Sequence, residues 1–231
     1  PYNSMDKPYM TGPYKGYEIQ ILPDNDCERP NDWNNDLFLV GFHRQFSVEK
    51  KGFEQNVVEA LLSPTTENQD GVSEEEVKNI RQEYHVFPLE AYIHSGVVLS
   101  LHSGVKKDRW DSSVLGAVFI KRAYYKTKKQ AQLAALDLLE TWNDYLAGNV
   151  YGYNVEAISA SCYGFYGDPK QSGCIEEVKA EIDAYLESHP TKTTSFSVSI
   201  TSREDAKAQL TQLLEEKTNA NIITGFSLLT Q

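Results

Sequence analysis

Two strand-like runs separated by a very short turn constrain the fold of this chain most. Residues 87–93 and 97–101 are rich in apolar residues, and only the tripeptide HSG at 94–96 separates them. Such a short connection permits an antiparallel pair, because a parallel crossover needs about a dozen residues or more. A third apolar run, 115–120, follows the polar segment HSGVKKDRWDSS at 102–113. These runs predict an antiparallel sheet near the middle of the chain.

Hydrophobic periodicity predicts the remaining elements. Strands are expected at residues 14–22, 37–43, 150–158 and 161–166, and the first two of these are expected to pair. Helices are expected at residues 53–62 and 175–186. A third helix is expected to begin after a capping box formed by Ser73 and Glu76. A fourth is expected to begin at a second capping box, Thr127 with Gln130, and to end at Gly148. The acidic segment 24–36 is expected to be a turn-rich loop.

The predicted fold class is α+β, with a mainly antiparallel sheet flanked by three to four helices. Residues 5–190 are expected to form the main domain. Residues 191–231 have the pattern of a small β-α-β unit, which is too short to be stable alone and is expected to pack on the main domain. Residues 1–4 are interpreted as a cloning remnant, with Met5 as the natural start.

Charge argues against one class of partner. The formal net charge of -11 disfavours binding to duplex nucleic acid, since affinity for phosphates comes mainly from clustered lysine and arginine. The charge is uneven: residues 105–129 carry eight basic and two acidic residues, whereas residues 131–189 carry two basic and ten acidic ones. A strongly acidic face can engage a basic partner or imitate nucleic-acid phosphates. The simpler interpretation is a solvated surface that keeps the protein soluble.

The sequence contains no recognisable motif for a cofactor or a metal, and no apolar segment of the length of a membrane span. The three cysteines include no CxxC pair, and the chain has no GxGxxG, no GxSxG and no apolar run long enough for a membrane span. We therefore expect no cofactor, no metal site and no membrane association. A reducing, cytoplasmic setting fits the low cysteine count. Whether the protein is an enzyme stays open, and binding without catalysis is favoured.

The candidate site residues lie at predicted turns and in an aromatic hairpin. HSGV occurs twice, at His94 and at His102, which allows either paired functional histidines or two histidines at strand ends. The glycine-interrupted hairpin after residue 150 predicts bulges or close packing of another backbone. Turns and loops on a scaffold are where binding residues concentrate. The candidates are His43, His94, Trp110, Asp111, Tyr151, Tyr153, Tyr163 and Phe165.

The order of several short motifs resembles a family of uncharacterised proteins from bacteriophages and mobile elements. The motifs are PNDWNN with Pro30, Trp33 and Asn35, FHR at 42–44, YIHSG at 92–96, WDS at 110–112, YLAGNVYGY at 145–153 and SCYGFYG at 161–167. The resemblance spans about residues 14–186, while the second HSGV and residues after 190 depart from it. It implies an accessory role inside a bacterial cell and carries over no activity or catalytic residue.

Two functional hypotheses follow. In the first, a phage or mobile-element accessory protein binds a host or defence-system protein through an acidic surface, with nucleic-acid mimicry as one mode. In the alternative, the chain is an enzyme or small-ligand binder whose pocket surrounds His43, His94, Trp110 and Asp111. A structural virion component is disfavoured, because the chain lacks internal repeats.

Overall fold

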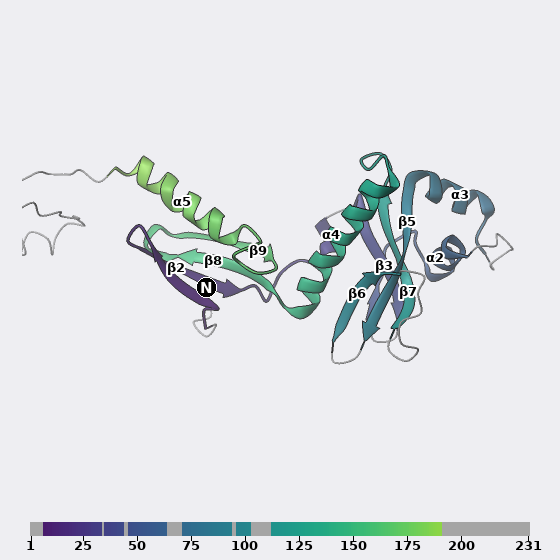
Figure 1. The fold of residues 1–231 in the computed structure, drawn as a ribbon, viewed down its shortest axis with the longest axis horizontal. Helices are drawn as coiled ribbons and strands as arrows, with labels where there is room; N and C mark the ends of the chain where they lie inside the picture. Colours follow the sequence, from purple (N-terminus) through teal and green to yellow (C-terminus); the bar gives the residue numbers. More distant parts are fainter. Residues whose placement is uncertain are drawn as a thin grey trace, which may run out of the picture. The chain divides into compact units, whose positions relative to one another are not determined.

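The computed structural model describes residues 7–33, 35–43, 46–63, 71–93, 96–102 and 112–190. The α+β class is confirmed, and the strands form two antiparallel sheets instead of one (Figure 1). The chain divides into two units between Lys179 and Ala180. The expected cloning remnant at 1–4 and the expected β-α-β unit at 191–231 lie outside the described residues.

Sheet A is built from the two ends of the first unit, in the order β1-β2-β8-β9. Its strands are β1 (Met10–Tyr14), β2 (Tyr17–Pro23), β8 (Val150–Val155) and β9 (Ala160–Tyr166), with the short 3-10 helix η1 (Glu156–Ile158) between the last two. The single strand expected at 14–22 is a hairpin, because Lys15 and Gly16 have positive φ angles of 48° and 87°. Positive φ at both turn residues is typical of a type I′ turn. Helix α5 (Cys174–Ser188) begins beside this sheet, with the Lys179 ammonium 5.7 Å from the ring centroid of Tyr14.

Sheet B contains the central strand pair that the sequence predicts. Its order is β4-β3-β7-β5-β6, and every pair in it is antiparallel. The strands are β3 (Leu37–His43), β4 (Phe46–Val48), β5 (Tyr84–Ile93), β6 (Val97–Leu101) and β7 (Ser112–Lys121). The predicted hairpin is confirmed as β5 and β6. The expected pairing of the first strand with β3 is wrong, since β2 pairs with β1 and β8.

Helices cover both faces of sheet B (Figure 1). Helix α4 (Lys128–Ala147) packs Leu138, Leu139 and Trp142 against one face, and helices α2 (Gln55–Leu62) and α3 (Glu74–Glu83) cover the other. The capping box at Thr127 is confirmed, and the helix ends at Gly148 with φ 71°. The acidic segment expected to be a loop contains one short helix, α1 (Pro30–Trp33).

Gly152 marks a place in sheet A where an aromatic ring approaches the backbone closely. β8 and β9 shift register between Tyr151 and Gly152, which confirms the predicted bulge. A Cβ at Gly152 would lie 2.2 Å from Cδ1 of Tyr163, so the tyrosine ring occupies the space that a side chain would need. An aromatic ring covering a strand glycine in this way shields the exposed backbone.

Two asparagine side chains occupy the place of a neighbouring strand in sheet B. Asn143 of α4 accepts a hydrogen bond from the N–H of Leu99 (2.8 Å) and donates one to its carbonyl (3.0 Å), on the edge strand β6. Asn31 of α1 makes the same pair with Leu39 of β3 (3.1 and 2.7 Å), beyond the last residue that pairs with β4. Both amides satisfy backbone groups that would otherwise lack a partner at a sheet edge.

Removing the side-chain amide of Asn31 should therefore destabilise the fold. We expect Asn31→Ala to lower the free energy of unfolding by about 1–3 kcal/mol, because it leaves the N–H and carbonyl of Leu39 buried and unsatisfied. Urea denaturation followed by circular dichroism measures the loss. Asn25→Ala, at an exposed turn residue, is the matched control and should change stability by less than about 0.5 kcal/mol. Equal effects of the two substitutions would contradict this role.

Candidate binding groove

A groove with a volume of about 540 Å³ lies where α1, the start of β3, the β7-α4 connection and α4 meet. We call it the α1-α4 groove. Its lining is mostly apolar and aromatic, with three polar side chains along α4. The lining residues are Pro30, Trp33, Leu37, Tyr124, Tyr125, Gln130, Leu133, Ala134, Asp137, Leu138 and Thr141.

One wall of the groove is a stripe along α4. Its lining residues follow one another at helical spacing from Gln130 to Thr141, so they share one face over three turns. At 1.5 Å per residue the stripe is about 16 Å long. Ala134 is buried at the bottom of this stripe, whereas Leu133 keeps 55% of its surface exposed. This wall is therefore mixed: Ala134 and Leu138 also belong to the core, Leu133 is an exposed apolar side chain, and Gln130, Asp137 and Thr141 are polar.

Trp33 also lines the groove, and Tyr166 holds its ring in place. Its ring stacks on Tyr166 of β9, with centroids 5.3 Å apart and an interplanar angle of 16°. The Tyr166 hydroxyl donates a hydrogen bond to the carbonyl of Glu28. Burial, together with the charges of Cys27 and Asp24, raises the pKa of Tyr166 to about 12, so the hydroxyl keeps its proton at physiological pH. Trp33 is thus held in place while 54% of its surface stays exposed.

Three large apolar side chains around this groove face solvent. Trp33, Leu133 and Tyr124 are 54%, 55% and 67% exposed. Single exposed apolar residues are normal on a protein surface, but a contiguous group beside a groove marks an interaction site. Tryptophan and tyrosine are also the residues that most often dominate binding energy at protein interfaces.

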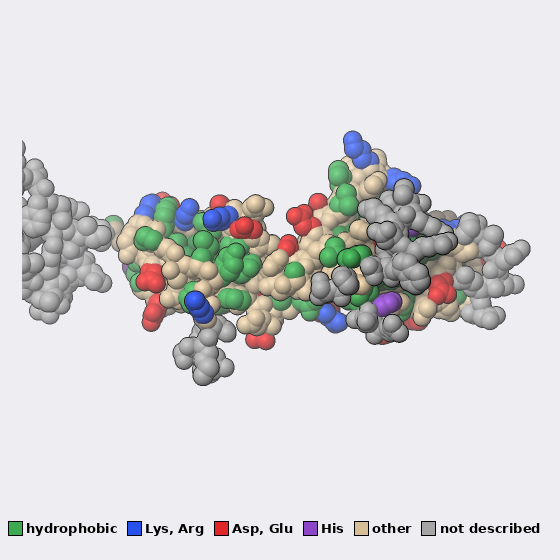
Figure 2. Space-filling model, turned by 60° about the horizontal axis from the view of Figure 1, so that its bottom comes forward, with side chains coloured by type: hydrophobic (Ala, Val, Ile, Leu, Met, Phe, Trp, Pro, Cys, Tyr) green, Lys and Arg blue, Asp and Glu red, His purple; other side chains and the backbone are tan. Residues whose placement is uncertain are grey.

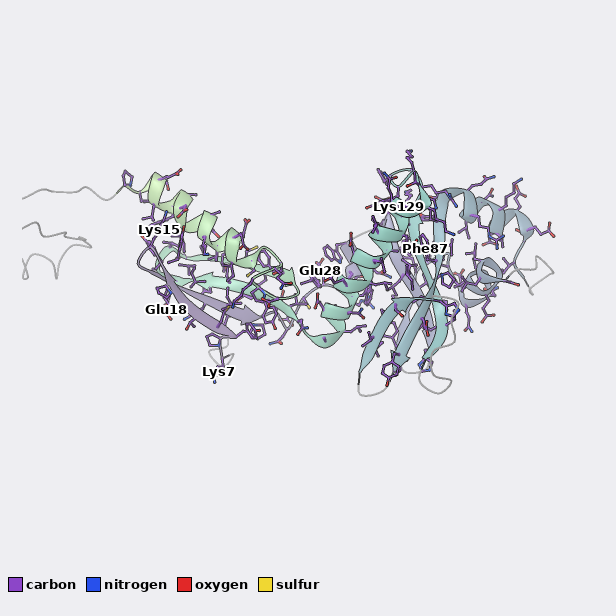
Figure 3. The ribbon with its side chains drawn as sticks, in the orientation of Figure 1. Lys7, Lys15, Glu18, Glu28, Phe87 and Lys129 are labelled. Atoms are coloured by element: carbon purple, nitrogen blue, oxygen red, sulfur yellow. The ribbon has the colours of Figure 1, made fainter. Side chains whose placement is uncertain are left out.

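Positive charge gathers at one end of the groove. Lys126, Lys128 and Lys129 are all exposed and lie between the lining residues Tyr125 and Gln130. Within the described part of the chain, these three lysines have no ion-pair partner, whereas Lys121 pairs with Asp36 at 3.2 Å. Figure 3 labels Lys129 at the start of α4, and Figure 2 shows Lys and Arg side chains gathered around that end of the helix.

The structure distributes the predicted site residues over both sheets. His43 ends β3 in sheet B and is half-buried. The four aromatic candidates belong to sheet A, where Tyr151 and Tyr153 are core residues with 8% and 2% exposure. Tyr163 and Phe165 of β9 are partly exposed, and the Phe165 ring lies 6.0 Å from that of Tyr153. His94, Trp110 and Asp111 lie outside the described residues.

Sequence reasoning missed the groove residues and one polar pair. Leu133 and Leu136 are apolar residues of α4 that lie outside the buried stripe of the helix. Apolar residues on the polar face of an amphipathic helix are the sequence signal that indicates an exposed apolar surface. The second histidine, His102, places Nδ1 3.3 Å from Oε2 of Glu90, a carboxylate that is only 7% exposed in β5. This contact gives a buried acidic group a partner, which is a structural role for His102.

In the described residues, no group of three or more His, Cys, Asp or Glu side chains is arranged to hold a metal ion. A search of the same residues for helices long and apolar enough to cross a membrane found none. Comparisons of the chain with protein-family models, with curated proteins and with solved structures found no match.

Proposed function

We propose that this chain is an accessory protein of a bacteriophage or mobile element that binds a protein of the host cell or of its defence systems through the α1-α4 groove. The observation that carries the proposal is the group of exposed apolar side chains around the groove, Trp33, Tyr124 and Leu133. The biological setting is supported by the motif resemblance alone.

The energetics of the groove favour a protein partner. Covering the exposed part of a half-exposed leucine or aromatic side chain contributes about 1 kcal/mol or more each, and a fixed side chain loses little conformational freedom on binding. Trp33 meets the second condition because Tyr166 already holds its ring. A preformed apolar surface of this kind supplies the central contacts of an interface, and charged residues around it supply the rim.

The lining is less suited to catalysis on a small substrate. Apart from the tyrosines, Asp137 is the one ionisable residue of the lining. Thr141 already donates its hydroxyl to the Asp137 carbonyl at 3.0 Å. Small-ligand sites usually direct several polar groups toward one point. The polar groups of this groove instead follow one another along a helix.

Binding through the acidic surface is the second candidate. Asp24, Asp26 and Glu28 lie in the connection between β2 and α1, and Asp32 lies in α1 itself. Burial is the main cause of the raised pKa of Tyr166, and the charges of Cys27, Asp24 and Glu28 add to it. A basic partner would be attracted to this connection. Neutralising it as Asp24→Asn, Asp26→Asn and Glu28→Gln would weaken such binding, whereas a partner held in the groove would be little affected.

A matched pair of substitutions tests the groove. The partner is first captured by a photoreactive amino acid placed at Tyr124 in bacterial cells, identified by mass spectrometry and purified. We expect Leu133→Asp to weaken its binding by about 100-fold or more, because a charge then enters an apolar contact. Leu136→Asp, on the same helix and 47% exposed but outside the lining, should change the affinity less than about threefold. Isothermal titration calorimetry measures both.

Each possible result has a definite meaning. Both leucines are exposed, so neither substitution should unfold the protein, and circular dichroism checks this. Wild-type affinity of the Leu133→Asp variant would overturn the proposal. Loss of binding only in the variant with neutralised acidic residues would favour the second candidate instead.

A further inference from the structure

We infer that the segment of the partner that occupies the α1-α4 groove is an amphipathic α-helix with acidic residues at the end that meets Lys126, Lys128 and Lys129. The inference rests on the proposed function and names the chemistry of the occupant. It follows from two separate properties of the groove, its shape and its charge.

The shape of the groove matches a helix of about three turns. The α4 wall runs from Gln130 to Thr141, and the aromatic residues Trp33, Tyr124 and Tyr125 also line the groove. A partner helix presents apolar side chains at i, i+3, i+4 and i+7, which line up over the same length. The small side chain of Ala134 at the floor lets a larger residue of the partner enter between the walls.

An extended strand would be held less well. Recognition of a strand depends on backbone hydrogen bonds to an open sheet edge. One wall of the groove is α4, whose central backbone groups are bonded within the helix, and the nearby backbone of Leu39 is already bonded to Asn31. Side-chain contacts are what this surface offers, and a helix supplies them without leaving its own backbone groups unsatisfied.

The charge of the groove selects an acidic end. Three exposed lysines lie at the start of α4, and within the described part of the chain none of them is paired with a carboxylate. The N-terminal end of α4 adds to the positive potential there. Carboxylates of a partner would compensate this charge, which the protein leaves uncompensated although its net charge is -11.

A charge-swap experiment on the full-length chain tests the inference. The probes are two fluorescein-labelled 16-residue helical peptides with one leucine stripe, one with three glutamates and one with three lysines in the first turn. Fluorescence anisotropy measures each peptide against the wild type and against the variant Lys126→Glu, Lys128→Glu, Lys129→Glu. Acidic residues are favourable in the first turn of a helix, so this variant should fold normally.

We expect the wild type to bind the glutamate peptide at least tenfold more tightly than the lysine peptide, and the triple variant to reverse this preference. The comparison of all four affinities cancels any difference in helicity between the peptides. Equal affinities in all four combinations, or no binding of either peptide below 1 mM, would overturn the inference. An acidic peptide that binds equally well to the Leu133→Asp variant would also overturn it, because the peptide would then lie outside the groove.

The Leu133→Asp variant and the triple lysine variant distinguish failure of the proposed function from failure of the acidic-helix inference. If Leu133→Asp abolishes binding of the captured partner while the triple lysine variant binds it normally, the proposed function stands and the acidic helix is wrong. If Leu133→Asp binds the captured partner normally, the proposed function itself fails. A captured partner that proves to be a second copy of this chain contradicts both the host-protein proposal and the inference.

Discussion

Alanine at Gly116 should unfold the protein or lower its free energy of unfolding by about 3 kcal/mol or more. Gly116 lies in the central strand β7, opposite Gly41 of β3 and beside the bulge at Leu115. A Cβ there would lie 1.9 Å from the carbonyl oxygen of Val40 and 2.8 Å from Cα of Gly41. These are backbone atoms, which cannot rotate away, so the two strands would have to separate.

Gly12→Ala is the matched control for this prediction. Gly12 also lies in a strand, β1, but nothing approaches within 4 Å of the position that its Cβ would take. Its substitution should change stability by less than about 0.5 kcal/mol. Urea denaturation followed by tryptophan fluorescence compares the two variants. Equal stability of the Gly116→Ala variant and the wild type would mean that β3 and β7 do not approach as closely as described.

Cys174 should react with thiol reagents at least about 100-fold more slowly than Cys162 in the folded protein. Cys174 is fully buried, whereas Cys162 is exposed. Burial, and then the nearby Cys162 and Glu176, raise the pKa of Cys174 from 9.0 to about 11. Since the thiolate is the reactive form, a rise of that size lowers the reactive fraction about 100-fold below pH 9, and burial of the sulfur slows the reaction further. Labelling with Ellman's reagent at pH 8 measures the two rates.

The same shift predicts a dependence of stability on pH. The folded protein holds the Cys174 proton more tightly than the unfolded chain does, so its contribution is fully present below about pH 9 and is lost as the pH rises toward about 11. In the labelling experiment, replacing both Cys162 and Cys27 by serine should remove the fast phase and leave the slow reaction of Cys174. A fast phase that persists in a variant lacking both Cys162 and Cys27 would show that Cys174 is accessible, and would contradict its burial.

Local signals predicted most elements of the fold. Helix α4 was placed correctly because Thr127 and Gln130 begin it and Gly148 ends it, and these features depend only on neighbouring residues. The β5-β6 hairpin was placed correctly because its turn is too short for any other arrangement. The division into two sheets was missed, since β2 finds its partner β8 far along the chain, and alternation of side chains does not specify which strands pair.

The candidate site was harder to predict from sequence. The groove depends on Trp33 meeting α4, and these segments are brought together by the fold, not by any local pattern. Leu115 illustrates the same difficulty: the bulge turns its side chain to the α4 side of sheet B, although alternation would place it with Ala117 on the other. Three of the predicted site residues, His94, Trp110 and Asp111, lie outside the described residues and stay predictions.

The side chain of Asn143 has a consequence for self-association. β6 is an edge strand, and an edge with open N–H and carbonyl groups is a template for strands of other molecules to add and aggregate. By bonding both backbone groups of Leu99, Asn143 occupies the middle of that edge with a side chain that cannot propagate a sheet. The same helix therefore carries Leu133, which lines the groove, and Asn143, which keeps the neighbouring sheet from growing.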